Sequence, residues 1–373
     1  MALKIVHIIA NSQTVPYFKW FAQKAQQQNK FIFSFVCMFP TPPLMIEEMR
    51  NYGIDCYWIP YDMTRRKTSL VKAFFSIYKL LKSIAPDVLH THLFDDSLVA
   101  LLAGKLLRIK KRIITKNDTA FHYYYTPKWV VFDKLNNANA TKIAAISMQS
   151  KKFIHDIEKA PKDKIELVHH GVSISEITNQ DEEVKKSVVS KYNLQDKFVI
   201  GNVSRLIDWK GHKYIIEAAS IVTKFFPNVI FLFIGKGEKK DELKSKIKSL
   251  NLEEYFIFID NVEPKNIPSY YGVMQLYVHA ASYEPFGFVI AEAILNGVPI
   301  VSTKTGAAAD IIINQENGIL VSEKNATELA NGIMETLKNY KRALEMSNVA
   351  NKQAEKIFNF DLMWSKYTKL YEE

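Results

Sequence analysis

Short, continuous runs of Ile, Val, Leu and Phe recur along the first half of the chain, separated by segments of helix length. Because these runs do not alternate with polar residues, they predict strands that are buried on both faces of a parallel sheet. Strands are expected at 4–9, 31–37, 55–59, 88–90, 112–115, 142–146 and 165–169. Helices are expected at 17–28, 70–84, 97–107 and 128–139. This alternation predicts a right-handed, doubly wound α/β sheet.

The same rhythm restarts at residue 198, after a polar and charged stretch. Strands are expected at 198–203, 229–234, 255–259, 276–278 and 299–302, and helices at 214–224, 239–250, 289–296 and 326–339. A chain of 373 residues is too long for one ordinary core. We therefore predict two Rossmann-like domains that face an interdomain cleft, and a terminal helix that packs back on the first domain. The expected boundaries are 1–175, a linker at 176–196, a second domain at 197–355 and the terminal helix at 356–373.

The bulk composition is that of a soluble globular protein, with 48% hydrophobic and 12% aromatic residues. Neither a signal peptide nor an apolar run of membrane-spanning length is recognisable in the sequence. Cys37 and Cys56 lie in apolar runs without metal-ligand spacing, which favours reduced, packed thiols. These features predict a cytoplasmic protein.

Positive charge is concentrated in the first half of the chain. Residues 1–180 hold 25 basic and 14 acidic residues, whereas the remainder holds 24 basic and 25 acidic residues. An excess of this kind would attract an anionic membrane leaflet or a lipid-linked phosphate. Segment 69–84, which carries Phe74, Phe75, Tyr78 and Leu81 among lysines, fits either an interfacial helix or an ordinary packed one. Nucleic acid is not an expected partner, because no reader motif accompanies the charge.

The run from Tyr283 to Ala293 places two carboxylates, Glu284 and Glu292, eight positions apart around a Phe-Gly-Phe turn. A carboxylate in such an apolar segment is costly to bury without a partner, and sugar hydroxyls offer donors in pairs. Backbone N–H groups at a helix start, made approachable by Gly287, suit a phosphate. The run therefore predicts a pocket for a ligand that is both a sugar and a phosphate ester.

Basic residues and glycines follow two predicted strands of the second half. Arg205 comes just after the strand at 198–203, and Lys210 lies just before the next helix. Such a pair of cations can neutralise a leaving diphosphate without a metal ion. Gly235 and Gly237 follow the strand at 229–234, where a nucleotide would meet the edge of the sheet, although a lone Gly-x-Gly also serves ordinary turns.

With these motifs, the chain resembles the retaining, GT-B-fold glycosyltransferases of family 4 over essentially its whole length. Glu284 and Glu292 match the family's Glu-x7-Glu motif, Arg205 and Lys210 match its diphosphate-binding pair, and the terminal helix is similar to its crossover helix. The resemblance implies transfer of a hexose-type sugar from a UDP-sugar or GDP-sugar donor, with retention and without a metal or other cofactor. The implied acceptor is a glycan or a lipid-linked molecule in the synthesis of cell-surface polysaccharide or glycolipid.

The resemblance also implies roles for individual residues. Glu284 would contact the donor sugar and Glu292 the ribose hydroxyls. The backbone N–H groups at Phe286, Gly287 and Phe288 would help to hold the diphosphate. The second domain would bind the donor and the first domain the acceptor, at the inner face of the cell membrane if the basic charge contacts it.

The first domain departs from the family pattern at the loop 10–16, which follows the first strand. Family members often have a glycine-rich loop there, whereas this loop contains no glycine. Asn11 and Ser12 are the residues expected to replace it in part.

A second departure follows the strand at 112–115. Many members carry a histidine at that point, whereas this chain reads Lys-Asn-Asp-Thr-Ala-Phe before reaching His122. We predict that His122 contacts the sugar or the reacting centre, and Asn117 and Asp118 remain alternatives.

The pair His90 and His92 raises the question of a metal site. At the sequence level we interpret two histidines at these positions of a strand end as facing opposite ways, which would exclude one shared ion. Asp95 and Asp96 lie where a helix cap is expected. The family resemblance also argues against a metal, and no metal site is predicted.

Two rival functions stay open. One is a sugar-nucleotide epimerase of the same architecture, against which the Glu284 and Glu292 motif weighs. The other is a protein that binds a nucleotide-sugar without catalysis, which the two departures in the first domain would permit.

Overall fold

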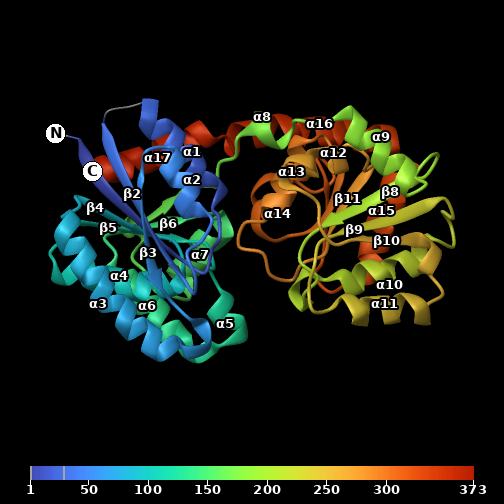
Figure 1. Ribbon diagram of the computed structural model, residues 1–373. Helices are drawn as coiled ribbons and strands as arrows, with labels where there is room; N and C mark the ends of the chain where they lie inside the picture. Colours follow the sequence, from blue (N-terminus) through green and yellow to red (C-terminus); the bar gives the residue numbers. More distant parts are fainter. Residues whose placement is uncertain (1, 28–29) are drawn as a thin grey trace. The chain divides into compact units, whose positions relative to one another are not determined.

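The computed structural model describes residues 2–27 and 30–373, and the chain divides into two compact units (Figure 1). Unit 1 runs to Gly171 and also takes in Phe360–Glu373, whereas unit 2 is Val172–Asn359. The first boundary thus falls four residues before the expected one, at 171 rather than 175. Unit 1 is therefore built from two separate segments of the chain, and unit 2 from the one segment between them.

A parallel sheet of seven strands forms the centre of unit 1, in the order β3-β2-β1-β4-β5-β6-β7. The strands are β1 (Leu3–Ala10), β2 (Phe31–Phe39), β3 (Asp55–Pro60), β4 (Val88–Thr91), β5 (Lys111–Lys116), β6 (Lys142–Ala145) and β7 (Ile165–Leu167). Every strand predicted for the first half is present, within two residues at each end. Cys37 on β2 and Cys56 on β3 are free thiols whose sulfur atoms lie 3.6 Å apart.

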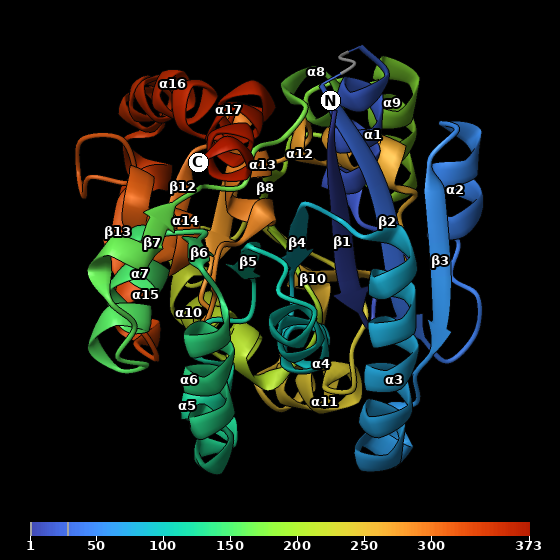
Figure 2. The same ribbon diagram turned by 90° about the vertical axis from the view of Figure 1, so that its left-hand side faces the viewer.

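Helices cover both faces of this sheet. One face carries α3 (Arg66–Ile84), α4 (Phe94–Leu106), α6 (Val130–Asn139) and α7 (Met148–Asp156), and Figure 2 shows α3, α4 and α6 in one layer. The other face carries α1 (Pro16–Gln27) and α17 (Phe360–Glu372). Two shorter helices, α2 (Met45–Asn51) and α5 (Phe121–Tyr125), follow β2 and β5. As expected, Asp96 caps α4, because its carboxylate accepts the N–H groups of His92 and Leu93.

The terminal helix α17 packs on unit 1 through aromatic side chains, as predicted. The Trp364 ring lies 5.2 Å from Phe21, 5.8 Å from Phe33 and 6.0 Å from Phe31. Lys24 of α1 also forms an ion pair of 2.6 Å with Asp361. The last residues of the chain therefore complete the core of the first unit.

Unit 2 repeats the doubly wound design with six parallel strands in the order β10-β9-β8-β11-β12-β13. The strands are β8 (Phe198–Val203), β9 (Val229–Ile234), β10 (Phe256–Ile259), β11 (Leu276–His279), β12 (Ile300–Thr303) and β13 (Ile319–Val321). The helices are α8 (Ile174–Ile177), α9 (Glu182–Lys191), α10 (His212–Val222), α11 (Lys240–Ser249), α12 (Ile267–Tyr271), α13 (Phe288–Leu295), α14 (Gly306–Ile311), α15 (Ala326–Lys338) and α16 (Tyr340–Ile357). The sequence pattern did not predict β13, α8, α9, α12, α14 or α16.

The segment 176–196, expected as a linker, is folded into unit 2. The Asp181 carboxylate caps α9 by accepting the N–H groups of Glu183 and Val184. The Asp181 N–H group in turn donates to Ser269 Oγ at 2.8 Å. The polar composition of this stretch reflects an exposed, capped helix and not a flexible connection.

Within residues 2–27 and 30–373, no helix combines the length and the apolar character needed to cross a bilayer.

The packing of α17 predicts the effect of truncating its central side chain. Trp364→Ala should lower the free energy of unfolding by about 3–5 kcal/mol, because Trp364 is 6% exposed and its loss leaves a cavity among three phenylalanines. Urea unfolding followed by tryptophan fluorescence or circular dichroism measures this loss. Leu362→Ala, on the exposed side of the same helix, is the control and should cost less than about 1 kcal/mol. Equal losses in the two variants would contradict the packing described.

Candidate functional site

The strand order of unit 2 reverses between β8 and β11, which are neighbours in the sheet. In open parallel sheets, ligands bind outside the carboxyl ends of the strands at such a reversal. The loops that leave β8 and β11 carry Arg205, Lys210 and Glu284, all expected at the site. The topology therefore gathers these three residues at one edge of one sheet.

The backbones of the loops after β8, β9 and β11 interlock. The Ser282 N–H group donates to Trp209 O at 2.9 Å, and the Leu206 N–H group donates to Lys236 O at 2.8 Å. A Cβ atom added at Gly235 would lie 2.1 Å from Ser204 O, and one at Gly237 would lie 2.1 Å from Leu206 O. These two glycines, expected to contact the donor, thus allow close approach of the loop that bears Arg205.

Lys210 and Glu284 form an ion pair across the reversal. Their side chains are only 12% and 10% exposed. The Nε2 atom of His279, at the end of β11, lies 3.5 Å from Glu284 Oε2, beyond good hydrogen-bond geometry. Arg205 differs from Lys210, because it is exposed and pairs with no carboxylate in the part of the chain that the structure describes.

The charge state of Glu284 is set by its neighbours. Burial alone would raise the pKa of its carboxyl, but His279 and the Lys210 ammonium outweigh burial and lower this pKa to about 2. Burial also lowers the pKa of His279, although Glu284 opposes that effect. At neutral pH the site therefore holds an ionised carboxylate beside an ammonium and a neutral imidazole.

The second carboxylate of the motif has a different environment. Glu292 lies on α13 and accepts a hydrogen bond of 2.9 Å from the Tyr271 hydroxyl. Burial raises the pKa of Glu292, and this hydrogen bond offsets only part of the rise. The motif thus joins one carboxylate held by a cation with one held by a neutral donor.

The turn between the two carboxylates begins α13. Gly287 has a φ of +84°, a conformation that favours glycine, and it immediately precedes the first helical residue, Phe288. The Phe286 ring is buried, at 5.0 Å from the Phe288 ring and 5.3 Å from the Phe358 ring. The Phe286 carbonyl accepts the Ala307 N–H group at 2.5 Å. The sequence placed Glu284 in the connection and Glu292 on the helix, and both placements are confirmed.

The loop after β1 in unit 1 forms its turn with Asn11 in the left-handed conformation and without a glycine. Asn11 has a φ of 57°, and asparagine is among the residues that tolerate this left-handed conformation best. Its N–H group donates to Met38 O at 2.9 Å, while Ser12 is half-buried. Because β1 and β4 are the strands at which the order of this sheet reverses, Asn11 and Ser12 lie at its reversal point.

His122 lies in a buried polar cluster. Its Nδ1 atom is 2.8 Å from Asp133 Oδ2, and its ring packs edge-on against Phe94 at 4.1 Å. Lys116 bridges Asp133 at 2.8 Å and Glu158 at 3.2 Å in the same cluster. The structure brings His122 to these partners, and its contact with a sugar stays a prediction.

Asn117, the first alternative to His122, is held by three groups. Its Nδ2 atom donates to His92 O at 2.9 Å and makes a longer contact of 3.5 Å with the Tyr17 hydroxyl. Its Oδ1 atom lies 2.7 Å from His170 Nε2. The side chain of Asn117 is thus fixed at the carboxyl end of β5.

The expectation that His90 and His92 face opposite ways is wrong. Positions two apart along a strand lie on the same face, and the two rings are 4.3 Å apart. His7 of β1 joins them, and one ligand atom from each of the three lies within 4.8 Å of the others. Each ring nitrogen of the three already has a hydrogen-bond partner; these partners are the neighbouring imidazoles, Tyr17, Thr115 and Tyr371. The predicted absence of a metal therefore no longer follows from strand geometry.

Sequence reasoning missed three groups near the expected site residues. These are His279, beside Glu284, and the pair Lys116 and Asp133, beside His122. His279 ends the strand just before the motif, so the same strand-end argument that selected Arg205 would have found it. No sequence pattern indicated Lys116 and Asp133 as members of a buried cluster, because nothing in the sequence marks a lysine as buried.

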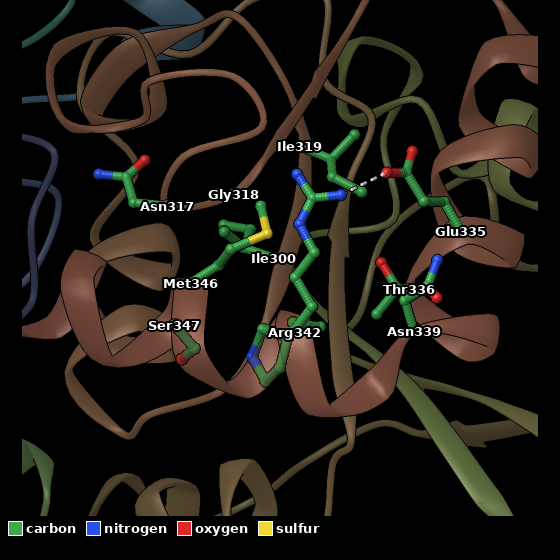
Figure 3. A pocket seen from close by; sticks show the side chains of 12 residues that line it. Ile300, Asn317, Gly318, Ile319, Glu335, Thr336, Asn339, Arg342, Met346 and Ser347 are labelled. Atoms are coloured by element: carbon green, nitrogen blue, oxygen red, sulfur yellow. Dashed lines mark ion pairs between the residues drawn. The ribbon is translucent and has the colours of Figure 1, made fainter.

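A small cavity of unit 2, shown in Figure 3, is distinct from the expected donor site. It has a volume of about 20 Å³ and lies beside the ion pair of Arg342 with Glu335, whose closest atoms are 3.6 Å apart. A space of this size holds about one water molecule. None of the residues that line it was expected at the donor site.

Comparisons with known proteins agree with this architecture. The family model described as "Glycosyl transferases group 1" matches residues 184–355, and the model described as "Glycosyltransferase Family 4" matches residues 24–176. The first match includes Arg205, Lys210, Glu284 and Glu292. The two matches together span most of both units.

Individual relatives are distant. The chain is 24% identical to the capsular polysaccharide biosynthesis glycosyltransferase CapM of Staphylococcus aureus over 372 residues, which cover 92% of this chain and 97% of CapM. It is 25% identical over 240 residues to an uncharacterised glycosyltransferase of Methanocaldococcus jannaschii, covering 64% of this chain and 61% of that protein. The crystal structure of HepE from Anabaena, in complex with UDP and glucose, matches with a TM-score of 0.82 at 19% identity over 98% of both chains.

Two Rossmann-like units with parallel sheets, and a terminal helix that returns to the first, define the GT-B class of fold. Within that class, the chain belongs to the group 1 glycosyltransferases of family 4. The resemblance found from the motifs is confirmed.

The opposite environments of the two motif carboxylates predict opposite effects of neutralising them. Glu284→Gln should lower the free energy of unfolding at pH 7 by roughly 3 kcal/mol, the equivalent of lowering a pKa from 4.5 to about 2. Because the folded-state pKa lies below the unfolded value, this stabilisation is present above about pH 4.5 and is lost as the pH falls toward 2. Thermal unfolding of wild type and variant across this pH range measures the difference.

Glu292→Gln is the matched control for that experiment. Burial raises the pKa of Glu292, so its ionised form is penalised in the folded state above the unfolded pKa. The variant should therefore be as stable as wild type at pH 7, or more stable. Similar losses in both variants at pH 7 would show that the two sites do not differ as described.

Proposed function

We propose that this protein is a retaining hexosyltransferase that moves a sugar from a UDP-sugar or GDP-sugar donor to a glycan or lipid-linked acceptor. The observation that carries the proposal is the Lys210–Glu284 ion pair at the strand reversal of unit 2, with the unpaired Arg205 on the same loop as Lys210. A carboxylate for sugar hydroxyls and two cations for a diphosphate are thereby gathered at one sheet edge.

The ion pair suggests how the donor binds. Before binding, the Lys210 ammonium and the Glu284 carboxylate neutralise each other in a nearly buried site. A donor diphosphate would compete for Lys210 and attract Arg205, because a diphosphate carries more charge than one carboxylate. Glu284, with His279 Nε2 at 3.5 Å, would then be free to accept hydrogen bonds from hydroxyls of the donor sugar.

We propose the transfer step that the family resemblance suggests. The bond between the anomeric carbon and the diphosphate oxygen breaks while the acceptor hydroxyl oxygen bonds to the same carbon on the same face. The departing phosphate oxygen takes the hydroxyl proton. Arg205 and Lys210 stabilise the charge that develops on the diphosphate, so the proposal requires neither a metal nor another cofactor.

The remaining contacts are assigned by the same logic. Glu292, a carboxylate that already accepts one hydroxyl donor, is proposed to bind the ribose hydroxyls. The backbone at Phe286, Gly287 and Phe288, where α13 begins, is proposed to face the diphosphate. In unit 1 the acceptor and the sugar are proposed to meet Asn11, Ser12 and His122, with Asn117 as the alternative to His122 at the end of β5.

Two of the relatives support the direction of this proposal. HepE is described in complex with UDP and glucose, which favours a UDP-sugar as donor here. CapM is a capsular polysaccharide biosynthesis glycosyltransferase, which favours the assembly of cell-surface polysaccharide. We place the enzyme in the cytoplasm, at the inner face of the cell membrane, where a lipid-linked acceptor would be reached.

The site assignment predicts the effect of removing either partner of the ion pair. Lys210→Ala and Glu284→Ala should each reduce sugar transfer by about 10²–10³-fold, because each removes a charged side chain that is proposed to contact the reacting donor. Lys224→Ala and Glu253→Ala, exposed residues of the same unit outside the proposed site, are the matched controls and should transfer like wild type. Initial rates measured on donor and acceptor test this, with circular dichroism to show that each variant is folded. Folded variants at both site positions with near wild-type rates would overturn the assignment.

The donor nucleotide can be identified by thermal unfolding in the presence of UDP-, GDP- and ADP-sugars. A ligand at about 100 times its Kd stabilises the folded state by about 2.7 kcal/mol, so the correct donor should raise Tm and the others should not. The shift should be lost in Lys210→Ala. Donor-derived sugar that is epimerised without an acceptor, as seen by NMR, would instead support the epimerase alternative. Binding with neither transfer nor slow hydrolysis would support a non-catalytic protein.

A further inference from the structure

Three helices of unit 1 present large apolar side chains to solvent. On α3 these are Val71 and Phe75, which are 59% and 58% exposed. The side chains of α4 and α6 that share this property are Leu102 (41%), Leu106 (59%), Val131 (60%), Phe132 (37%) and Leu135 (45%). The helices lie in one layer, since α4 contacts both α3 and α6 (Figure 2). We call the outward side of this layer the α3–α4–α6 face.

These exposed residues are additional to the apolar residues that hold the helices on the sheet. On α3 the buried side chains are Ala73, Ile77 and Leu81, which belong to the core cluster of unit 1. Phe74 and Tyr78 pack against the same cluster. Helix α3 is therefore a packed helix whose second apolar stripe, Val71 and Phe75, faces outward.

The charged residues on these helices have one sign at the surface. The exposed cations are Lys67, Lys72, Lys79, Lys82, Lys105 and Lys134. The acidic residues of the three helices, Asp95, Asp96 and Asp133, are all buried. Asp95 pairs with Arg66 at 2.5 Å, and Asp133 pairs with Lys116. Along the whole described length of α3, α4 and α6, no carboxylate is exposed to balance the lysines.

Lysines and apolar residues are interleaved at helical spacing. Val71 and Phe75 are four positions apart, and Lys72, Lys79 and Lys82 fall beside them on the same outward stripe. Leu102 and Leu106 flank Lys105 in the same way on α4. Side chains in this pattern can insert their apolar parts at a lipid interface while the ammonium groups stay among the headgroups.

We propose that the α3–α4–α6 face docks on an anionic membrane leaflet. The inference rests on the proposed function, because it supplies the surface by which an enzyme with a lipid-linked acceptor would reach its substrate. A nucleic acid would neutralise the lysines but leave the apolar side chains in water. A second copy meeting the same face about a two-fold axis would bring like charges together. An anionic lipid surface satisfies the lysines and the apolar residues together.

Binding to lipid vesicles tests the proposal. The full-length protein should co-sediment with vesicles of phosphatidylcholine and phosphatidylglycerol, should bind phosphatidylcholine alone much less, and should be released by salt. The double variant Lys72→Glu with Phe75→Ser should weaken binding to the anionic vesicles by more than about tenfold, since one lysine near the surface accounts for about fivefold.

The matched control lies in unit 2, where Lys224 precedes Phe225, which is 68% exposed. Lys224→Glu with Phe225→Ser makes the same chemical change at similar exposure and should bind vesicles like wild type. Circular dichroism and Tm must show that both double variants are folded. No binding of wild type to anionic vesicles, equal binding to neutral vesicles, or an equal loss in the control would each overturn the proposal. So would a dimer in vesicle-free solution that the α3 variant abolishes.

Two further measurements separate this proposal from the proposed function. Lys210→Ala should lose glycosyl transfer and still bind vesicles. The α3 double variant should lose vesicle binding and keep the slow donor hydrolysis of the wild type. Vesicle binding without any glycosyl transfer would contradict the proposed function alone. Transfer without vesicle binding would contradict the docking surface alone.

Discussion

The candidate site of unit 2 depends on one constraint, which is that all strands of the sheet are parallel and so release their loops at the same edge. Lys210 and Glu284 are 74 residues apart in the chain, yet the reversal of strand order between β8 and β11 makes their loops neighbours. The close backbone contacts at Gly235 and Gly237 then fix the loop that carries Arg205. The chemistry of the site follows from sheet topology more than from any local motif.

Burial has different consequences for the ionisable groups of the two units. Glu284 remains ionised although it is nearly buried, because an ammonium and an imidazole lie beside it. In unit 1, Lys116 is 3% exposed and is held by Asp133 and Glu158. Removing one member of such a buried group leaves the others uncompensated, which is more costly than replacing the whole group by apolar side chains. In both places the charged side chains compensate one another, and a ligand or a substitution would disturb that balance.

The strands could be predicted well because their apolar runs are continuous and end at glycine or polar residues. The predictions failed where the signal is short or misleading. Strand β13 has only three residues, and α9 is so polar that it resembled a linker until its cap and its contact with Ser269 were seen. The prediction for His90 and His92 failed for a different reason. Positions two apart on a strand lie on the same face, whereas the prediction placed them on opposite faces. Of the site, the Glu284 and Lys210 pair was foreseeable from motif and strand ends, whereas the partner of His122 depends on how α6 packs and was not.

The return of α17 to unit 1 has a consequence for synthesis on the ribosome. Unit 2 is one continuous segment, so it can fold as soon as it has emerged. Unit 1 needs Trp364 and Tyr371, which are translated after unit 2, to cover Phe21, Phe31 and Phe33. Until then, a nascent chain carries an uncovered aromatic surface at its amino-terminal end. A truncation that removes α17 would therefore uncover the core of unit 1, the unit that is made first, and leave unit 2 intact.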